Sequence, residues 1–445
     1  MNKYEQELQE AHLPLLRLAF CMPLLNYGLF SKKIHLNFPV SKADFSLLSD
    51  LQIIFSRDIF VNKIAHGTNP YILPKFFPDQ KKIKPTDGNP KAVIHTQRLI
   101  DDRALEMEMD AMKSGVLSSG GKDSLLTYGL LKELGSTVSP FYVNESGGHW
   151  RTALTAYKYH KKTEPHTQRV WTNVDRFYSF MLDHLRFIRP DHRKIRHDTY
   201  PIRLCIFPFY VFSLLPLFVE NRIGNLLLGS EFDDLRYEIR YKGIQHYFGI
   251  YDQHQDYDVR MNAWYKKRIP GLYQWSALRN ISGLVDQNIL VRRYPALAKL
   301  QRSCHSCHIS HGVVYPCGTC SKCLGILLYL LANNLDPTLM KYRQKDIDYF
   351  YANVGASSLK LDKDEKNQSF FLLRKKGSVP KVQCVDHVEK IHVHASTCDP
   401  GLYPKQFRDE LLRILEQYTT GYCILKNGAW VPSEKWQERT TTIIP

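Results

Sequence analysis

The chain has 445 residues, which is long for one average domain and predicts two or three, at least one of them with a substantial core. With 44% hydrophobic and 23% charged residues it has the composition of a folded protein, which excludes an intrinsically disordered chain. The 60 Lys and Arg against 44 Asp and Glu leave a formal net charge of +16, which favours an anionic partner such as a nucleotide, a phosphorylated metabolite or RNA.

The N-terminal part of the chain has the least specific pattern. Residues 1–100 mix helical and strand-like stretches and predict a separate α+β domain. The apolar stretches 13–30 and 204–219 both contain prolines, and the second is shorter than the roughly 20 apolar residues that cross a membrane. Both therefore predict buried helices, and no membrane partner is expected. Because the chain starts without a segment typical of a secretory signal, the cytoplasm is the expected location.

The middle of the chain has the pattern of an α/β fold. Residues 101–112 contain strong helix formers and no breaker, and predict a helix. A short apolar strand at 115–118, a turn with two glycines, a helix at 125–134 and a strand at 138–143 follow. This order is a βαβ unit, which predicts a parallel sheet. A further buried strand is predicted at 225–229.

The glycine turn predicts a phosphate site. Gly120 and Gly121 allow the backbone to approach an anion closely, and the helix start that follows offers N–H groups and the positive end of its dipole. The hydroxyls of Ser119 and Ser124 and the ammonium of Lys122 add donors. The spacing matches neither the Walker motif nor the dinucleotide fingerprint.

A polar tip follows the strand at 225–229. Ligands of open α/β sheets bind at the carboxyl ends of strands, and this tip carries Glu231, Asp233 and Asp234. Mg²⁺ commonly neutralises bound phosphates and is held by one or two carboxylates, so Mg²⁺ is expected beside the predicted phosphate site. These three residues are the predicted Mg²⁺ ligands, and a solvated acidic loop is the alternative.

Half of the ten cysteines lie in one short stretch, which favours metal ligation over disulfides. Two Cys-x2-Cys steps place the thiolates of Cys317, Cys320 and Cys323 around one point. A fourth thiolate, from Cys304 or Cys307, would complete a tetrahedral zinc site. Closed four-thiolate sites are structural, so the zinc is expected to hold the loop rather than to act on a substrate.

The end of the chain has a different pattern. A polar linker is predicted at 357–378, followed by strand-like pieces around Val382 and at 391–393 and by an amphipathic helix at 404–418. These elements predict a small α+β appendage over residues 346–445.

The sequence Ser-Gly-Gly-Lys-Asp-Ser at 119–124 resembles the PP-loop of the N-type ATP pyrophosphatases. The cysteine spacing is similar to that of the 7-cyano-7-deazaguanine synthases within this superfamily. The resemblance covers about residues 113–335 and implies a core of the adenine nucleotide alpha hydrolase-like type, a Rossmann-like α/β/α sandwich with a zinc-bound loop, over 101–345. Members of that family lack the two terminal additions, which leaves the substrate open.

The resemblance also implies an activity and a set of site residues. ATP would be cleaved to AMP and pyrophosphate while the oxygen of a small carboxylate or amide substrate is adenylated. In the related fold the end of the second strand faces the adenosine, so Glu145 there is assigned to the adenosine or to this substrate. Arg203, before the apolar helix, is assigned to an anionic substrate on its charge and not on the resemblance. The residues assigned to ATP are Ser118, Ser119, Gly120, Gly121, Lys122, Asp123, Ser124 and Asn144, of which Lys122, Asp123 and Ser124 are assigned to catalysis.

Other functions stay open at this point. The basic charge supports a PP-loop enzyme that modifies tRNA, although the remaining cysteines form no paired motif for thiolation. A carboxyl-activating epimerase of a cell-wall precursor also uses a PP-loop. A zinc-containing module that binds nucleic acid without catalysis is the alternative to an enzyme, and ATP-dependent release of pyrophosphate would discriminate between them. The oligomeric state, a homodimer included, is open.

Overall fold

The described residues of the computed structural model are 3–145, 147–195, 200–237, 239–247, 249–355, 359, 361–374 and 379–436. The chain divides into two compact units, each built from separate stretches. Unit 1 consists of Met1–Lys113, Val170–Asn225 and Asp234–Gln274, and unit 2 of Ser114–Arg169, Leu226–Asp233 and Trp275–Pro445. The three consecutive domains expected from the sequence stay a prediction.

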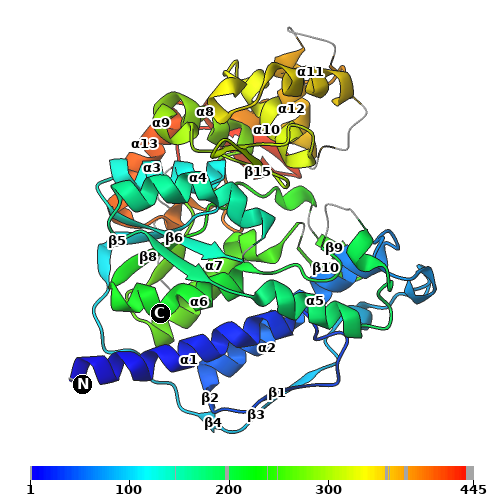
Figure 1. Cartoon of the computed structure of the whole chain (residues 1–445), viewed down its shortest axis with the longest axis vertical. Helices are drawn as coiled ribbons and strands as arrows, with labels where there is room; N and C mark the ends of the chain where they lie inside the picture. Colours follow the sequence, from blue (N-terminus) through cyan, green and yellow to red (C-terminus); the bar gives the residue numbers. More distant parts are fainter. Residues whose placement is uncertain are drawn as a thin grey trace. The chain divides into compact units, whose positions relative to one another are not determined.

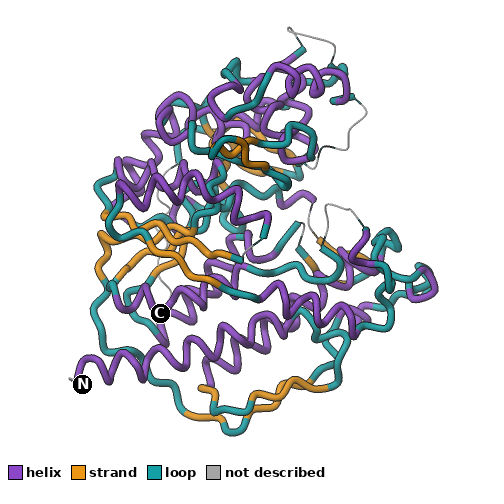
Figure 2. Tube along the Cα trace, in the orientation of Figure 1, coloured by secondary structure: helices purple, strands orange, loops and turns teal. Residues whose placement is uncertain are grey.

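The main sheet has five parallel strands in the order β11-β8-β5-β6-β7. The strands are β5 (Asp110–Leu117), β6 (Thr137–Asn144), β7 (Gln168–Trp171), β8 (Ile223–Leu227) and β11 (Tyr273–Trp275), and Figure 2 shows strands in orange. β8 is buried along its whole length, as expected for an inner strand of a parallel sheet. The predicted mixed α/β class and the parallel sheet are confirmed.

The order of the strands reverses at β5. The chain runs from β5 through α3 (Lys122–Glu133) to β6 and β7, and it later forms β8 and β11 on the other side of β5. In open parallel sheets such a reversal leaves a crevice at the carboxyl ends of the two strands that flank it, here β5 and β8. The glycine turn follows β5 and the acidic tip follows β8, so the topology brings both to the same edge of the sheet.

The structure differs from the prediction before the βαβ unit. The helix predicted at 101–112 is wrong, because residues 101–109 have no regular secondary structure and β5 begins at Asp110. The side-chain amide of Asn225 donates to the carbonyl oxygens of Ala111 at 2.7 Å and Lys113 at 3.2 Å. Such tertiary hydrogen bonds hold this segment in the sheet and override helix propensity, which is a weak local preference.

Unit 1 is mainly helical. Its helices are α1 (Lys3–Leu25), α2 (Lys42–Ile59), α5 (Val174–His184), α6 (Phe207–Glu220) and α7 (Gln255–Arg268), with a π-helical turn at Phe60–Ala65. Its short strands pair as β1 (Lys33–Leu36) with β3 (Val93–Thr96), β2 (Val40–Ser41) with β4 (Leu99–Ile100), and β9 (Ile239–Tyr241) with β10 (Ile244–His246). α1 and α6, which contain most of the two apolar stretches, pack against each other (Figure 1). In the described part of the chain, no helix has the length and apolar content of a membrane span.

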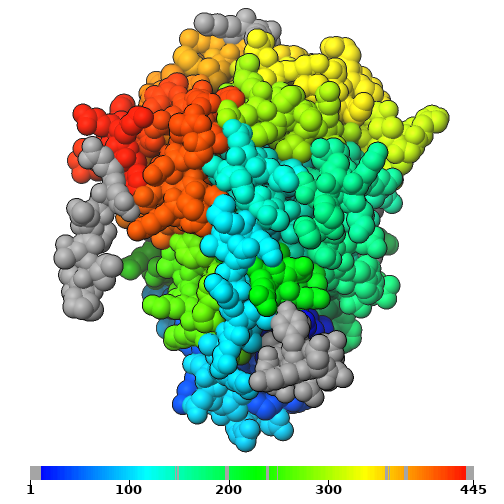
Figure 3. All heavy atoms as spheres, turned by 90° about the vertical axis from the view of Figure 1, so that its left-hand side faces the viewer, coloured from blue at the N-terminus to red at the C-terminus, as the bar shows by residue number. Residues whose placement is uncertain are grey.

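Unit 2 includes residues 346–445, which are called the C-terminal segment below. Its helices are α3, α4 (Gly148–Thr163), α8 (Gly283–Arg293), α9 (Pro295–Ala298), α10 (Ser321–Ala332), α11 (Gln344–Asn353), α12 (Lys363–Leu373) and α13 (Lys405–Glu416). β12 (His308–Ser310) pairs with β13 (Val313–Tyr315), and β14 (Ile391–Val393), β15 (Tyr422–Lys426) and β16 (Ala429–Ser433) form a three-stranded sheet. In Figure 3 the orange and red residues of the C-terminal segment lie directly beside the yellow and yellow-green residues of this unit. The strand predicted at 391–393 and the helix predicted at 404–418 are confirmed, whereas Val382 lies outside any strand.

The sequence predicts a polar linker at 357–378, and this is wrong over the residues of α12. Asp362 caps this helix, because its side chain accepts hydrogen bonds from the N–H groups of Asp364 and Glu365. Gln368 and Ser369 are 1% and 0% exposed, so polar residues of α12 face the interior of unit 2. The many polar residues predicted an exposed loop here. This was wrong because composition alone does not show that some of these polar side chains are buried.

Unit 1 buries an acidic side chain at the start of α6. Asp252 is 1% exposed, and its Oδ2 accepts a hydrogen bond from Phe207 N at 2.9 Å. Burial raises the pKa of Asp252 from 3.8 to about 7, although hydrogen bonds from backbone N–H groups act in the opposite direction. A carboxyl group with a higher pKa in the folded state holds its proton more tightly there. The protein is therefore expected to lose stability as the pH rises from about 4 to 7.

We expect Asp252→Asn to remove most of this pH dependence. As the pH rises from the pKa of the unfolded state to that of the folded state, ionisation of the carboxyl group should lower the free energy of unfolding by up to ~4 kcal/mol. The amide of asparagine does not ionise, so the variant should lack this change. Urea unfolding at pH 5 and pH 8 measures the effect, and the variant should gain stability relative to the wild type at the higher pH. Parallel pH profiles of the two proteins would contradict this interpretation.

Candidate active site

The turn after β5 is shaped by close packing. Ser118 N donates to Phe141 O at 2.8 Å and so continues the contact with β6. Gly120 has a φ of +71°, and a Cβ at this position would lie 3.0 Å from Thr152 O and 3.1 Å from Ala153 Cα in α4. A side chain here would strain the backbone and crowd α4, which explains why the position is glycine.

Hydroxyl groups surround this turn. Gly120 N donates to Ser118 Oγ at 3.4 Å, Ser118 Oγ donates to Ser124 Oγ at 3.3 Å, and Ser124 Oγ donates to Gly121 O at 3.2 Å. Gly121 is the N-cap of α3 and provides no side chain, which leaves the N–H groups of the first turn to an anion. A Cβ on Gly121 would lie 3.3 Å from Ser119 Oγ, so this hydroxyl lies beside the start of α3. The arrangement can bind a phosphate group.

Lys122, the first residue of α3, is buried among three carboxylates. Its Nζ lies 2.5 Å from Asp123 Oδ1, 2.6 Å from Glu231 Oε1 and 3.2 Å from Asp286 Oδ2. A Cβ at Gly229 would lie only 2.8 Å from the Cβ of Asp123. The acidic tip after β8 therefore passes directly over the start of α3, and glycine is required for this approach.

The three carboxylates differ in exposure and in pKa. The side chains of Asp123 and Glu231 are 34% and 30% exposed, whereas that of Asp286 is 0% exposed. Burial raises the pKa of Glu231 and of Asp286 well above the usual range, with Lys122 acting against it. Burial also opposes ionisation of Asp123, but Lys122 and hydrogen bonds from the other two carboxyl groups outweigh it and lower the pKa of Asp123 to about 2. One lysine cannot neutralise all three groups, so the cluster retains protons unless a further cation binds.

The cluster has the donor set of a divalent cation site. One oxygen each from Asp123, Glu231 and Asp286 lie within 4.8 Å of one another. Asp286 Oδ1 is buried, and no described group forms a hydrogen bond with it. A buried carboxylate oxygen without a partner costs free energy, and such oxygens are the preferred ligands of Mg²⁺. These residues therefore fit Mg²⁺, which is the ion expected from the sequence.

A fourth acidic side chain holds the start of α8. Glu365, in α12, accepts a hydrogen bond from Gly283 N at 2.6 Å and another from the Tyr329 hydroxyl at 2.6 Å. Burial raises the pKa of Glu365, and the Tyr329 hydrogen bond opposes this effect. Gly283 is the first residue of α8, the helix that carries Asp286. The C-terminal segment thus positions a helix of the cluster.

The structure separates the three predicted Mg²⁺ ligands. Glu231 lies in the cluster, but Asp233 forms an ion pair with Arg279 at 3.5 Å, and Asp234 forms one with Arg236 at 2.5 Å. The sequence alone missed Asp286. That residue and Glu365 each follow a capping residue in the first turn of a helix, a common helix-start pattern that indicates no ligand.

The predicted substrate residues lie in different units. Asn144 ends β6 and is half-buried, and Glu145 after it is 7% exposed, with no hydrogen-bond partner for Oε1 among the described residues. Arg203 belongs to unit 1, where its guanidinium lies 4.4 Å from the ring centroid of Tyr178 and 4.1 Å from that of Tyr200. At the edge of the sheet, Glu145 Oε1 can therefore still accept a hydrogen bond. The guanidinium of Arg203 lies instead against two aromatic rings.

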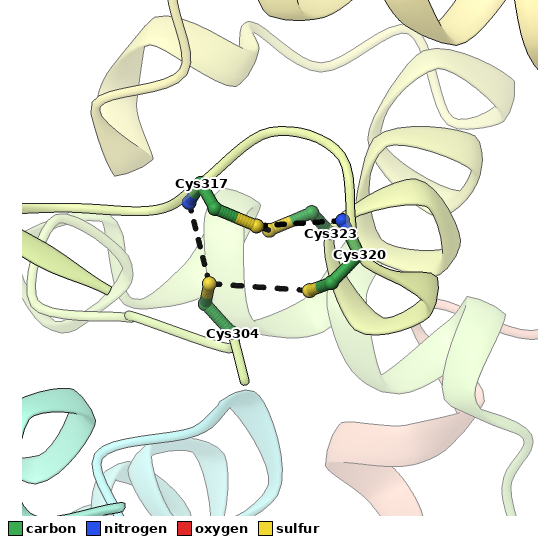
Figure 4. A group of neighbouring side chains, drawn as sticks. All are labelled: Cys304, Cys317, Cys320 and Cys323. Atoms are coloured by element: carbon green, nitrogen blue, oxygen red, sulfur yellow. Dashed lines mark hydrogen bonds between the residues drawn. The ribbon is translucent and has the colours of Figure 1, made fainter. Parts of the chain in front are cut away.

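Four cysteines converge in unit 2, as Figure 4 shows. The Sγ atoms of Cys304 and Cys320 are 3.9 Å apart, and those of Cys317 and Cys323 are 3.8 Å apart. A tetrahedral zinc site with Zn–S bonds of ~2.3 Å requires S–S distances of about 3.8 Å. The predicted cluster is therefore confirmed as a group that can bind zinc.

Cys304, rather than Cys307, completes this group. Backbone N–H groups of Ser306 and Cys317 donate to Cys304 Sγ at 3.2 and 3.3 Å, and Cys320 N donates to Cys317 Sγ at 3.4 Å. Hydrogen bonds of this kind stabilise the negative charge of thiolate ligands. Cys307 is buried but lies outside the group of four.

The segment before Cys304 contacts the glycine turn. Arg302 N donates to Gly120 O at 3.2 Å. The Arg302 side chain is buried and donates to the carbonyl oxygens of Val314 and Gln301, both at 2.7 Å. Cys304, a member of the four-cysteine group, therefore lies two residues after one that contacts the turn.

Comparison with known proteins provides no family for this chain. No protein-family model matches it, and no curated protein matches it. The function of this chain therefore has to follow from the chemistry of the site itself.

The assignment of the zinc ligands is tested by two neighbouring substitutions. We expect Cys304→Ser to reduce the zinc content from about one ion per chain to less than about a tenth of that value, because three thiolates bind zinc more weakly than four. Cys307→Ser should retain the metal, and Cys384→Ser, at an exposed cysteine, serves as the control. Metal analysis of the purified variants measures this. Zinc loss in Cys307→Ser and retention in Cys304→Ser would reverse the assignment.

Proposed function

We propose that this protein is an ATP pyrophosphatase of the PP-loop type, an adenylating synthase or ligase similar to the 7-cyano-7-deazaguanine synthases. The observation that carries the proposal is that an uncapped glycine turn at the start of α3 adjoins the cluster in which the buried Lys122 meets Asp123, Glu231 and Asp286. Hydrogen-bond donors that could bind a phosphate and carboxylates that could bind a cation thus lie together at the carboxyl edge of a parallel sheet. Nucleotides bind at this edge in Rossmann-like folds.

The turn accounts for binding of the phosphates. The N–H groups at the start of α3 and the hydroxyl of Ser119 are donors for the group that leaves as pyrophosphate. The hydroxyl of Ser124, which donates to Gly121 O, would join them by turning its proton toward the phosphate. Asp123, Glu231 and Asp286 would hold Mg²⁺, which neutralises phosphate charge and polarises the phosphate oxygens. Lys122 keeps its ammonium charge, because burial is outweighed by the three carboxylates, which raise its pKa well above the usual range.

The reaction needs no protein nucleophile. An oxygen of a substrate carboxylate or amide attacks the α-phosphorus of ATP and forms the new P–O bond. The bond from the α-phosphorus to the bridging oxygen breaks, and its electron pair leaves on pyrophosphate. Fixed donors around the turn stabilise this charge as it develops, which is the main catalytic task in phosphoryl and nucleotidyl transfer.

We propose that the substrate binds at the neighbouring end of β6. Glu145 there has a buried oxygen without a described partner, which suits a substrate that carries N–H or O–H donors. The four-cysteine zinc site acts as structural support in this proposal, since its closed thiolate set leaves no open position for a substrate.

A matched pair of substitutions on the acidic tip tests this function. Purified protein with ATP, Mg²⁺ and a metabolite extract should release AMP and pyrophosphate. Glu231→Gln should lower the rate at least about 100-fold, because it removes a charge that would hold the metal. Asp233→Asn, two residues further along and paired with Arg279, should stay within about threefold of the wild type.

Chromatography of the nucleotides and an enzyme-coupled pyrophosphate assay measure both products. Release of ADP and phosphate, or no turnover even when tRNA is supplied, would overturn the proposal and favour the nucleic-acid-binding alternative. Full activity of Glu231→Gln would contradict the metal assignment alone.

A further inference from the structure

Two hydroxyls from different parts of the chain lie close to Gly121. A Cβ built on Gly121 would lie 3.3 Å from Ser119 Oγ and 3.7 Å from Ser303 Oγ. Ser119 belongs to the glycine turn, whereas Ser303 immediately precedes the zinc-cluster residue Cys304. Residues 302–323, which contain the four cysteines and are called the zinc segment below, therefore form part of the edge of the turn.

The hydrogen bonds of Ser303 leave its proton available. Ser303 Oγ accepts a hydrogen bond from Gln301 Nε2 at 3.2 Å. Gln301 is in turn held by Gln287, whose Nε2 donates to Gln301 Oε1 at 3.0 Å, and these two side chains are 1% and 0% exposed. A hydroxyl has one proton to donate, and no described residue accepts it from Ser303. The buried glutamine pair thus orients a hydroxyl whose donor function is unused.

The backbone on both sides of Ser303 is fixed. Arg302 N donates to Gly120 O at 3.2 Å, which attaches the preceding residue to the turn. The carbonyl oxygen of Ser303 lies 3.9 Å from Cys323 Sγ, and Cys304 belongs to the four-cysteine group. The hydroxyl is therefore held beside the turn rather than free to rotate away with a mobile loop.

We propose that Ser303 donates a hydrogen bond to the phosphates bound in the glycine turn, and that the zinc site positions it there. This inference rests on the proposed function, since it requires phosphate in the turn. It makes the zinc segment part of the nucleotide site. An apolar residue in place of Ser303 should leave one phosphate oxygen without a donor. A hydrogen bond to a charged oxygen typically changes affinity by about 10- to 100-fold.

The test measures binding of two probes to the full chain by calorimetry, with Mg²⁺ present: pyrophosphate and α,β-methylene-ATP, which cannot be cleaved at the bond in question. Ser303→Ala should bind both about 10- to 100-fold more weakly than the wild type, with unchanged zinc content and thermal stability. Ser306→Ala is the matched control, because Ser306 is an exposed serine of the same zinc segment. It should bind both probes as the wild type does.

A second pair isolates the hydroxyl if Ser303→Ala loses zinc. Ser303→Thr and Ser303→Val have nearly the same shape, and only the first can donate. The proposal is supported if the threonine variant binds both probes about 10- to 100-fold more tightly than the valine variant does. Equal affinity of the wild type and Ser303→Ala at full zinc content, or of the threonine and valine variants, would overturn it. If the wild type binds neither probe, the proposed function itself fails.

Discussion

The site in unit 2 depends on one interaction, the ion pairing of the buried Lys122 ammonium group with three carboxylates. Removing such a charge from water is costly unless opposite charges replace its hydration. Asp123, Glu231 and Asp286 provide this replacement, and they come from α3, from the tip after β8 and from α8. One lysine therefore joins three segments that are far apart in the sequence, and the edge of the sheet is defined by where they meet.

Close approach of these segments creates an imbalance of charge. Gly229 allows the tip to cross α3, and Gly283 allows Glu231 to reach the start of α8, where a Cβ would collide with the Glu231 carboxylate. The cluster then has more carboxyl groups than lysines and adjoins a turn suited to a phosphate, which is also negative. Such neighbours repel each other unless a divalent cation lies between them. In the proposed function, this geometry would favour a nucleotide that arrives with its metal over a free nucleotide.

Local spacing made part of this site predictable. The glycine turn between strand and helix and the Cys-x2-Cys steps are short patterns, and residues close in sequence remain close in the fold. Asp286 and Glu365 were harder to predict, because only long-range packing brings their helices, α8 and α12, to the site. The same limit explains the helix wrongly predicted at 101–112 and the missed helix α12. In both segments the decisive contacts come from residues distant in sequence, such as Asn225 for β5.

The segments outside the βαβ unit have a common role. That unit supplies the turn together with Lys122 and Asp123, but none of the other cluster residues. Arg302 attaches the cysteine segment to Gly120, and Glu365 attaches α12 to the first residue of α8. Transfer of a nucleotidyl group depends on donors that are fixed before the charge develops, since reorganising them during the reaction costs free energy. In the proposed function, the zinc segment and the C-terminal segment would be the supports that fix the two sides of one site.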